Sequence, residues 1–263
     1  MVIESRTARG KNERLAALAD ELVRLNVDII VTVNTPAAQA AKNATTTIPI
    51  VVTRIADPVK AGLVSSLAQP GRNLTGLSSS AVEVAPKQLQ LLTEILPRIS
   101  RVALLWNAEN PAATIGAGEM EKAAAQISLQ VLRVPVRVPS DFPSAFQAAT
   151  RASVEALVLF EDLWLINHRL QIISHAARYV LPVMSLYRDF PEAGGLLSYG
   201  TSARALYRRA AFYVDRILKG TKPRDLPIEQ PTTFELVINM RTARALGLTI
   251  PPSVLARADQ IIE

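Results

Sequence analysis

Polar side chains recur directly after short apolar runs of this chain, and their types suit the binding of a small ligand. Asn34 and Thr35 follow the apolar run Val27–Val33, and Pro36 then opens a segment with helical spacing. Free N–H groups at the start of a helix, together with the helix dipole, attract a carboxylate or another anion. The alternative is that Thr35 serves only as the N-cap of that helix and needs no ligand.

Similar groups follow later runs of the chain. Asp57 precedes Pro58 after a β-rich run, where its carboxylate suits a ligand ammonium or caps a helix that follows. Asn107 and Asn110 can both donate and accept through their amides, although such residues also build plain turns. The other residues of this kind are Trp106, Glu161, Asp162, Tyr187 and Arg188, of which Trp106 and Tyr187 offer an apolar wall. Ligands of open α/β sheets bind beyond the carboxyl ends of the strands, so this set predicts a binding cleft.

Motifs for catalysis are absent from the sequence. It contains no G-x-x-x-x-G-K-[ST] phosphate loop and no G-x-S-x-G nucleophile turn. It has no cysteine, which excludes disulfides, thiolate catalysis, cysteine-ligated zinc and iron–sulfur clusters. Its two histidines, His168 and His175, lie on one expected helix but not at the i, i+4 spacing of helical metal sites. We therefore predict no enzymatic activity, no cofactor and no metal.

The composition fits a folded protein of one large or two smaller domains. The chain has 263 residues, of which 49% are apolar, enough to bury a sizeable core. Its 29 Lys and Arg against 23 Asp and Glu give a net charge of +6. These basic residues are scattered and not interleaved with aromatic rings, which argues against nucleic-acid binding. No apolar stretch reaches the ~18 residues that span a bilayer. No leader opens the chain, so the protein as written is expected in the cytoplasm.

Short β-rich runs alternate with helical periodicity along the chain. The expected strands are Val27–Val33, Ile48–Val52, Arg101–Trp106, Leu129–Val134, Ala156–Phe160, Val183–Ser185, Leu196–Tyr199 and Phe234–Ile238. The expected helices start near the N-cap Asn12 and near Pro36, Pro86, Ala112, Ile166, Ser202 and Arg241. This alternation predicts an α/β fold with mostly parallel sheets. The Gly- and Ser-rich stretch Gly71–Ala85, with Ser78–Ser80 as a linker, is expected to mark a boundary between lobes.

Several segments together resemble a bacterial family of ABC-transporter substrate-binding proteins, the tryptophan/tyrosine-uptake-like group. The most distinctive are FELVINMRTARALGLTIPP at Phe234–Pro252 and EAGGLLSYG at Glu192–Gly200. Others are Asp57-Pro58-Val59, PGRNLTG at Pro70–Gly76 and Leu104–Asn107. The resemblance covers essentially the whole chain.

That resemblance implies a type I periplasmic-binding-protein-like fold with two doubly wound, Rossmann-like lobes joined by a three-strand hinge. The N-lobe is expected to hold residues 1–78 and 200–227, and the C-lobe residues 79–199 and 228–263. The strand-end loops would then line a cleft between the lobes and take an amino acid or another small, often aromatic, carboxylate. Family members are normally exported and feed a membrane permease, so a periplasmic location, an ABC permease partner and a monomer are expected.

The start of the chain differs from that family pattern. Members carry a leader, a first strand and a first helix before the segment that matches Val2–Arg6, and these are absent from the sequence as given. We therefore expect the N-lobe to lack its first strand and helix, with Val2–Ser5 and Val27–Val33 as the strands on either side of the missing one. A mis-called start codon or a degraded gene would both produce such a chain.

Three functions remain open from the sequence. The first is the solute-binding component of an ABC importer, which closes its lobes on the ligand. The second is a cytoplasmic ligand-sensing or regulatory protein of the same bilobal fold, or a non-functional truncated product. The third is an α/β enzyme, for which the chain offers no recognisable nucleophile–base pair.

Overall fold

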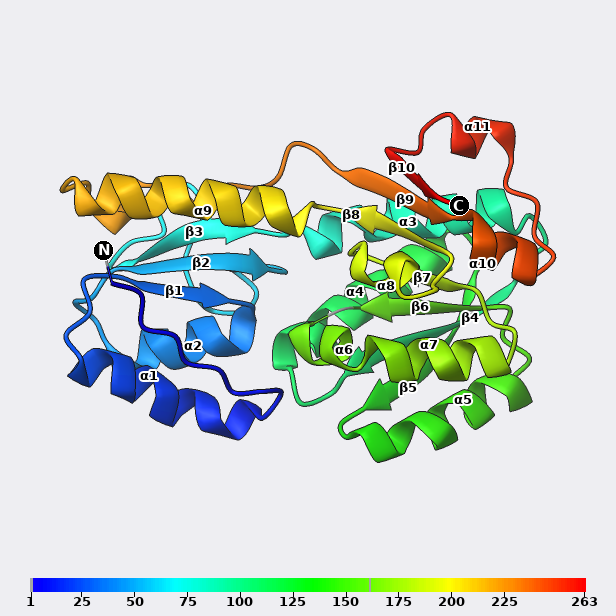
Figure 1. The fold of residues 1–263 in the computed structure, drawn as a ribbon, viewed down its shortest axis with the longest axis horizontal. Coiled ribbons are helices and arrows are strands. Elements are labelled where there is room, and N and C mark those ends of the chain that lie inside the picture. Colours follow the sequence, from blue (N-terminus) through cyan, green and yellow to red (C-terminus); the bar gives the residue numbers. More distant parts are fainter. Residues whose placement is uncertain (1, 161) are drawn as a thin grey trace. The chain divides into compact units, whose positions relative to one another are not determined.

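The computed structural model describes residues 2–160 and 162–263 of the chain, so Glu161 lies outside the described residues. The chain divides into two compact units (Figure 1). Unit 1 is Met1–Ser80 with Ala203–Thr232, and unit 2 is Ala81–Ser202 with Thr233–Glu263. Each unit is therefore built from separate stretches of sequence, and the chain passes three times from one unit to the other.

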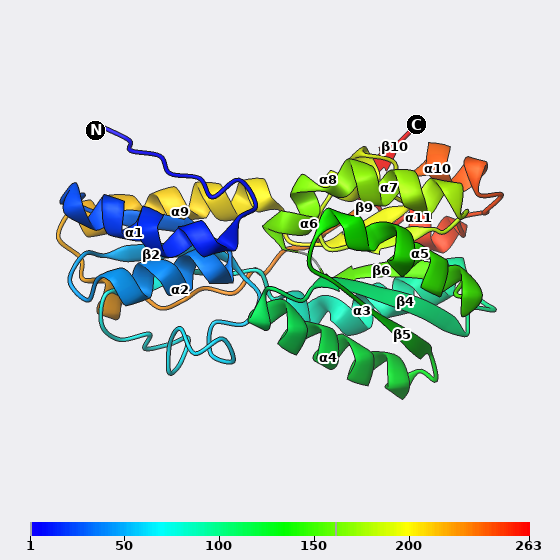
Figure 2. The same ribbon diagram turned by 90° about the horizontal axis from the view of Figure 1, so that it is seen from below.

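Unit 1 is a parallel sheet with helices on both faces. Its strands are β1 (Ile30–Val33), β2 (Ile50–Ile55) and β3 (Leu74–Ser78), in the order β1-β2-β3. The helices α1 (Leu15–Arg24), preceded by the 3-10 turn η1 (Asn12–Arg14), and α2 (Thr35–Ala44) lie on one side, and α9 (Ala203–Leu218) lies on the other (Figures 1 and 2). A short 3-10 turn, η3 (Pro223–Asp225), follows α9.

Alternate residues of the strands form two separate cores in unit 1. Ile50 and Val52 of β2 pack with Ala38 of α2, whereas Val51 between them packs with Leu206 of α9. Side chains of a strand point to opposite faces at successive residues, so a continuous apolar run requires cover on both sides. The predicted strand at Ile48–Val52 is thus present and covered on both faces, but it runs from Ile50 to Ile55.

The Gly- and Ser-rich stretch Gly71–Ala85, which was expected to mark a boundary between lobes, also contains a buried strand, β3. A Cβ at Gly76 would overlap the backbone of Val52 in the neighbouring strand, so only glycine allows this approach. Ser78, Ser79 and Ser80 are all buried. The small residues of this stretch therefore allow close packing. The chain passes from unit 1 to unit 2 inside this stretch, after Ser80.

Unit 2 contains one mixed sheet. Its strands are β4 (Arg101–Asn107), β5 (Gln130–Val136), β6 (Ala156–Phe160), β7 (Val183–Ser185), β8 (Leu197–Gly200), β9 (Glu235–Asn239) and β10 (Gln260–Ile262), in the order β10-β9-β8-β7-β6-β4-β5. Strand β9 runs antiparallel to β8, and the other pairs are parallel. The α/β fold with mostly parallel sheets is thus confirmed, while β3 and β10 were not predicted.

Helices of unit 2 pack against this sheet. They are α3 (Ala81–Ile95), α4 (Pro111–Gln126), α5 (Phe142–Arg151) after the turn η2 (Pro139–Asp141), α6 (Leu163–Asn167), α7 (Arg169–Arg178), α8 (Asp189–Glu192), α10 (Met240–Ala245) and α11 (Pro252–Leu255). Helix α3 begins before Pro86, which was expected at its start, and carries that proline inside its first two turns. His168 lies at the junction of α6 and α7, so the prediction of one continuous helix for both histidines was wrong.

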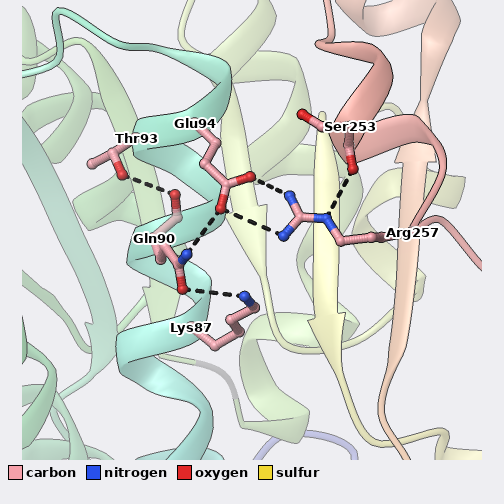
Figure 3. A network of polar contacts seen from close by, with 6 residues as sticks. All are labelled: Lys87, Gln90, Thr93, Glu94, Ser253 and Arg257. Atoms are coloured by element: carbon pink, nitrogen blue, oxygen red, sulfur yellow. Dashed lines mark hydrogen bonds and ion pairs between the residues drawn. The ribbon is translucent and has the colours of Figure 1, made fainter.

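Polar contacts attach the C-terminal segment to α3. Arg257 forms an ion pair with Glu94 and donates to the backbone oxygen of Ser253, 3.0 Å away (Figure 3). Gln90 donates to the same Glu94 carboxylate at 3.0 Å, and Lys87 donates to Gln90 at 3.1 Å. These contacts hold α11 and Arg257, which follows it, against helix α3. Among the helices of residues 2–160 and 162–263, none combines the length and apolar character needed to cross a membrane.

Two expectations for the start of the chain were wrong. Val2–Ser5 forms no strand, and the side chains of Val2 and Ile3 are 86% and 78% exposed. An extended segment becomes a strand only when a neighbour supplies ladder hydrogen bonds, and in the described chain β1 pairs with β2 alone. Asn12 does not cap the first helix either, because the 3-10 turn η1 already begins at Asn12 and no side chain caps it.

Candidate functional site

Three polar residues meet at the carboxyl ends of β4 and β6 in unit 2. Asn107 ends β4, Asn110 is the N-cap of α4, and Asp162 is the N-cap of α6. Because β4 and β6 are parallel neighbours, the loops after them emerge at the same edge of the sheet. The Asp162 Oδ2 accepts from Asn107 Nδ2 at 2.7 Å and from Asn110 Nδ2 at 3.2 Å. We call these three residues the Asp162 cluster.

Backbone contacts fix the orientation of both amides in the Asp162 cluster. The Oδ1 of Asn107 accepts from the N–H of Glu109 at 3.0 Å, and the Oδ1 of Asn110 accepts from the N–H of Ala112 at 3.1 Å. With each amide oxygen occupied by a backbone N–H, the nitrogen of each side chain faces the carboxylate. The cluster is therefore preorganised before any ligand arrives.

Burial dominates the electrostatics of Asp162. Its side chain is 7% exposed, and its Oδ1 accepts from the N–H of Leu165 at 3.0 Å. Burial raises the pKa of Asp162 above its ordinary value, and the donors from Leu165, Asn107 and Asn110 only partly oppose this shift. In the described part of the chain no Lys or Arg forms an ion pair with this carboxylate. A cationic group of a ligand would supply the missing positive charge.

The other predicted residues of unit 2 have different surroundings. Trp106 is buried in β4, and its Nε1 donates to Thr114 Oγ1 of α4 at 3.2 Å. Tyr187 is buried just after β7. Arg188 donates to Glu192 at 2.7 Å and lies 3.7 Å from the carboxylate of Glu235. Their role in ligand binding stays a prediction.

Arg188 and its partners form a second charged group at the same end of the sheet. Hydrogen bonding to Glu192 raises the pKa of Arg188, and burial raises the pKa of Glu235. Arg188 also donates to Gln260 at the start of β10. These contacts hold Arg188 against β9 and β10, so a ligand anion would compete with two carboxylates for the guanidinium.

In unit 1, Asn34 takes the capping position that was predicted for Thr35. The Oδ1 of Asn34 accepts from the N–H of Ala37 at 3.1 Å, and Thr35 is the first residue of α2. Asn34 has φ +72° and ψ 167°, which lies outside the left-handed helical region that asparagine tolerates, so its backbone is strained at this position. The Asn34 side chain thus satisfies the N–H of Ala37, and the backbone carbonyl of Asn34 accepts from Ala38. Pro36 has no N–H, so in the described chain the N–H of Thr35 is the one left at this helix start.

Asp57 caps a turn and not a helix. Its Oδ1 accepts from the N–H groups of Val59 and Lys60 at 3.1 and 2.9 Å, and the residues after it form turns. Pro58 starts this turn with a fixed φ, and the contact pattern is an Asx-type turn. The second carboxylate oxygen of Asp57, Oδ2, takes no part in these two hydrogen bonds.

Two groups at the strand ends of unit 1 escaped the sequence prediction. Ser78 and Ser79 both donate through their hydroxyls to the carbonyl of Ile55, at 3.1 and 3.3 Å. Arg54 has a φ of +57° where the β2–β3 register shifts, and its guanidinium donates to Tyr207 of α9 at 3.2 Å. Bulges of this kind redirect a side chain, and Arg54 is thereby turned toward α9. An arginine within an apolar strand was the one signal of this feature in the sequence.

A hollow of about 340 Å³ lies elsewhere in unit 2, between α5 and α7. Its lining includes Phe142, Pro143, Leu170 and His175. His175 stacks on Phe146 with ring centroids 5.2 Å apart, which shows that this histidine serves packing. The described residues contain no group of three or more His, Cys, Asp or Glu that could hold a metal ion.

Comparison with known proteins adds to this geometry. A sequence model of the family described as ABC transporter substrate binding protein matches residues 1–262. The chain is 25% identical over 246 residues to a "Tyrosine-binding protein" of Clostridioides difficile (strain R20291), covering 94% of this chain and 70% of that protein.

Two solved structures are similar over nearly the whole chain. One is a conserved domain protein from Vibrio cholerae, with a TM-score of 0.91 and 32% identity over 97% of this chain and 86% of that chain. The other is an ABC domain in complex with L-Trp from Streptococcus pneumonia, with a TM-score of 0.90 and 29% identity over 96% of this chain and 87% of that one. These likenesses confirm the fold that the sequence resemblance implied.

Proposed function

Because the chain belongs to the ABC transporter substrate binding protein family, we propose that it is the solute-binding component of an ABC importer. Its ligand in this proposal is an amino acid, with an aromatic one preferred. The proteins named for tyrosine and crystallised with L-Trp support that ligand class. The proposal places the protein outside the cytoplasmic membrane, where it feeds a permease.

The observation that carries the proposal is the Asp162 cluster. A buried carboxylate, oriented by two amides and lacking an ion-pair partner in the described chain, matches a ligand ammonium. An amino acid brings that ammonium together with a carboxylate, which needs N–H donors in return. At the start of α2 in unit 1, the N–H of Thr35 and the side-chain NH₂ of Asn34 remain as such donors in the described chain, because the N–H of Asn34 itself donates to Thr53.

The remaining residues take the roles that the sequence suggests. Asp57 faces a second donor, Asn107 and Asn110 orient the ligand, and Trp106 or Tyr187 supplies an apolar wall, with Arg188 as an additional polar contact. In this mechanism the ligand contacts both units and favours the closed arrangement through its higher affinity for it. We propose that the protein binds and releases its ligand without changing it chemically.

A thermal-shift series with wild-type protein tests the ligand class. L-Trp, L-Tyr and L-Phe are compared with indole-3-propionate, which keeps the ring and the carboxylate but lacks the ammonium. We expect the amino acids to raise Tm and indole-3-propionate to raise it much less, because a ligand that binds only the native state stabilises it. Folded protein that none of these amino acids stabilises would contradict the proposed ligand class.

The variant Asp162→Asn supplies the matched control. It keeps the size of the side chain and one acceptor oxygen but removes the charge. We expect it to bind L-Trp at least about tenfold more weakly, which corresponds to the loss of one charge-assisted hydrogen bond. Its affinity for indole-3-propionate should stay within about twofold of the wild-type affinity. Equal losses for both ligands would assign Asp162 a structural role only.

A further inference from the structure

Helix α9 carries a line of exposed basic and aromatic residues on its outer side. Arg204, Arg208, Phe212 and Arg216 follow one another at four-residue intervals, and all four are exposed. Residues four apart lie on one face of a helix, about 6 Å from one another along the axis. The opposite face is buried against the sheet of unit 1 through Leu206, Ala210, Tyr213 and Ile217. We call the exposed line the arginine ridge.

The arginine ridge costs the helix stability. The first turn of α9 contains no acidic residue, and Arg204 and Arg208 lie in the first two turns, near the positive end of the helix dipole. Like charges four residues apart also repel each other. In the described part of the chain neither Arg204 nor Arg208 forms an ion pair. The helix therefore gains nothing from these two charges, which points to a role outside the fold.

An aromatic group lies in the middle of the ridge. The ring of Phe212 is 40% exposed, and the guanidinium of Arg209 lies 4.0 Å from its centroid. The guanidinium of Arg216 lies 5.8 Å from the same centroid. Arg209 is neutralised by Glu229 through two hydrogen bonds of 2.7 and 2.6 Å. Exposed rings beside arginines are typical of the energetic centres of protein interfaces.

We propose that the arginine ridge is a docking surface for a protein partner that presents a helix with carboxylates four residues apart. The charge is complementary, and the 6 Å repeat of the ridge is the repeat of i, i+4 side chains on any helix. Arg204 and Arg208, which form no ion pair in the described part of the chain, have planar guanidinium groups that bind carboxylates in a bidentate way. The proposal concerns a surface on α9 and does not depend on the small ligand or on the residues proposed to bind it.

Asp215 argues for a protein partner over a phosphate-rich one. It lies beside the ridge and pairs with Lys219 at 2.8 Å. A carboxylate in this position repels the phosphates of a nucleic acid or an anionic membrane, whereas a protein can match it with a single basic side chain. The three ridge arginines also lie along one line of α9, which fits one helix better than a planar surface.

The test uses the full-length protein, labelled with ¹⁵N, and a synthetic helical peptide. The peptide carries Glu at positions i, i+4 and i+12 and Leu at i+8, and a scrambled peptide of the same composition is the comparison. Binding is read from the backbone amide shifts of α9, which detect even millimolar affinities. We expect saturable shifts confined to α9 with the patterned peptide and at least about tenfold weaker binding of the scrambled one.

Charge reversal provides the matched variants. R204E/R208E alters the ridge, and R98E/R241E makes the same change of net charge at two exposed arginines elsewhere. We expect the first variant to weaken peptide binding at least about tenfold and the second to keep it within about twofold. R204E/R208E should remain folded with an equal or higher Tm, since glutamate is favourable near a helix N-terminus.

Two results would overturn the proposal. One is the absence of α9 shifts with the patterned peptide in the folded wild-type protein. The other is ridge-dependent binding to vesicles of phosphatidylcholine and phosphatidylglycerol, or to a single-stranded DNA oligonucleotide, that exceeds binding to the patterned peptide. Either outcome leaves the small-ligand proposal intact, because L-Trp binding is measured separately.

Discussion

Asp162 has a structural role in addition to the ligand-binding role that we propose for it. The same side chain caps α6 through the N–H of Leu165 and accepts from the amides of Asn107 and Asn110. Its pKa is nevertheless raised, because burial outweighs these donors. Stability and ligand binding should therefore both depend on pH in the range where this group titrates.

The first prediction at this scale concerns stability. Since the folded pKa of Asp162 lies above the value of about 3.9 in an unfolded chain, the native state binds this proton more strongly. The contribution of this group is therefore fully present below the unfolded pKa and is lost as pH rises through the folded pKa. Urea unfolding of the wild type and of Asp162→Asn across that range measures it. The free energy of unfolding of the wild type should fall relative to the variant, and parallel profiles would contradict the raised pKa.

The second prediction concerns affinity. A ligand ammonium interacts with the ionised form of Asp162, so binding must displace the proton that burial retains. We expect the affinity for L-Trp to rise with pH through the folded pKa and then level off. Calorimetric titration at several pH values measures this, and Asp162→Asn should show no such rise. A pH-independent wild-type affinity would remove Asp162 from the ammonium site.

At the scale of elements, apolar runs were the dependable signal. Ala156–Phe160 and Val183–Ser185 have the bounds that the sequence predicted, because both strands are covered on both faces and contain no polar residue before their ends. Because apolar runs mark the strands, the polar residues that follow them, Asn107 and Asp162, were correctly predicted to lie at strand ends. It missed β3 because close approach to Val52 requires Gly76, and glycine weakens the strand signal.

The contacts of Arg54, Ser78 and Ser79 could not be predicted from apolar runs. Arg54 reaches Tyr207, which is distant in sequence, only because β2 has a bulge there. The hydroxyls of Ser78 and Ser79 share one carbonyl, that of Ile55, across the sheet. Such contacts depend on register and tertiary packing, which a single sequence does not contain.

A pair of glycines in α4 gives a prediction at this scale. A Cβ at Gly116 would overlap the ring of Phe160 in β6, whereas a Cβ at Gly118 would meet open space. Gly118→Ala should stabilise the protein by about 0.5–1 kcal/mol through helix propensity. Gly116→Ala should destabilise it by about 1–3 kcal/mol, because overpacking outweighs that gain. Urea unfolding of both variants measures the difference.

The two glycine variants control for each other, since the substitution and the helix are the same. Equal effects on the free energy of unfolding would show that α4 does not pack on Phe160 as closely as described. A Gly116→Ala variant that is more stable than the wild type would lead to the same conclusion.

The organisation of the whole molecule bears on the proposed mechanism. The chain connects the two units at three places, after Ser80, Ser202 and Thr232. Such connections can act as a hinge when a ligand has differential affinity for the closed arrangement. We expect saturating L-Trp to lower the radius of gyration in small-angle X-ray scattering, and Asp162→Asn at the same concentration to show a smaller change. An unchanged radius in protein that binds L-Trp would refute closure.

Each unit is made of two separate stretches of the sequence, and this affects how the chain folds during synthesis on the ribosome. Strands β2 and β3 leave the ribosome early, but the helix that covers one of their faces, α9, begins only at Ala203. At about 5–20 residues per second, the intervening ~120 residues take roughly 6–25 s to translate. During that interval Val51 and Leu77, which later pack against α9, lack their cover. The nascent chain thus presents an apolar sheet face to chaperones and to neighbouring nascent chains until translation has passed through the whole middle of the sequence.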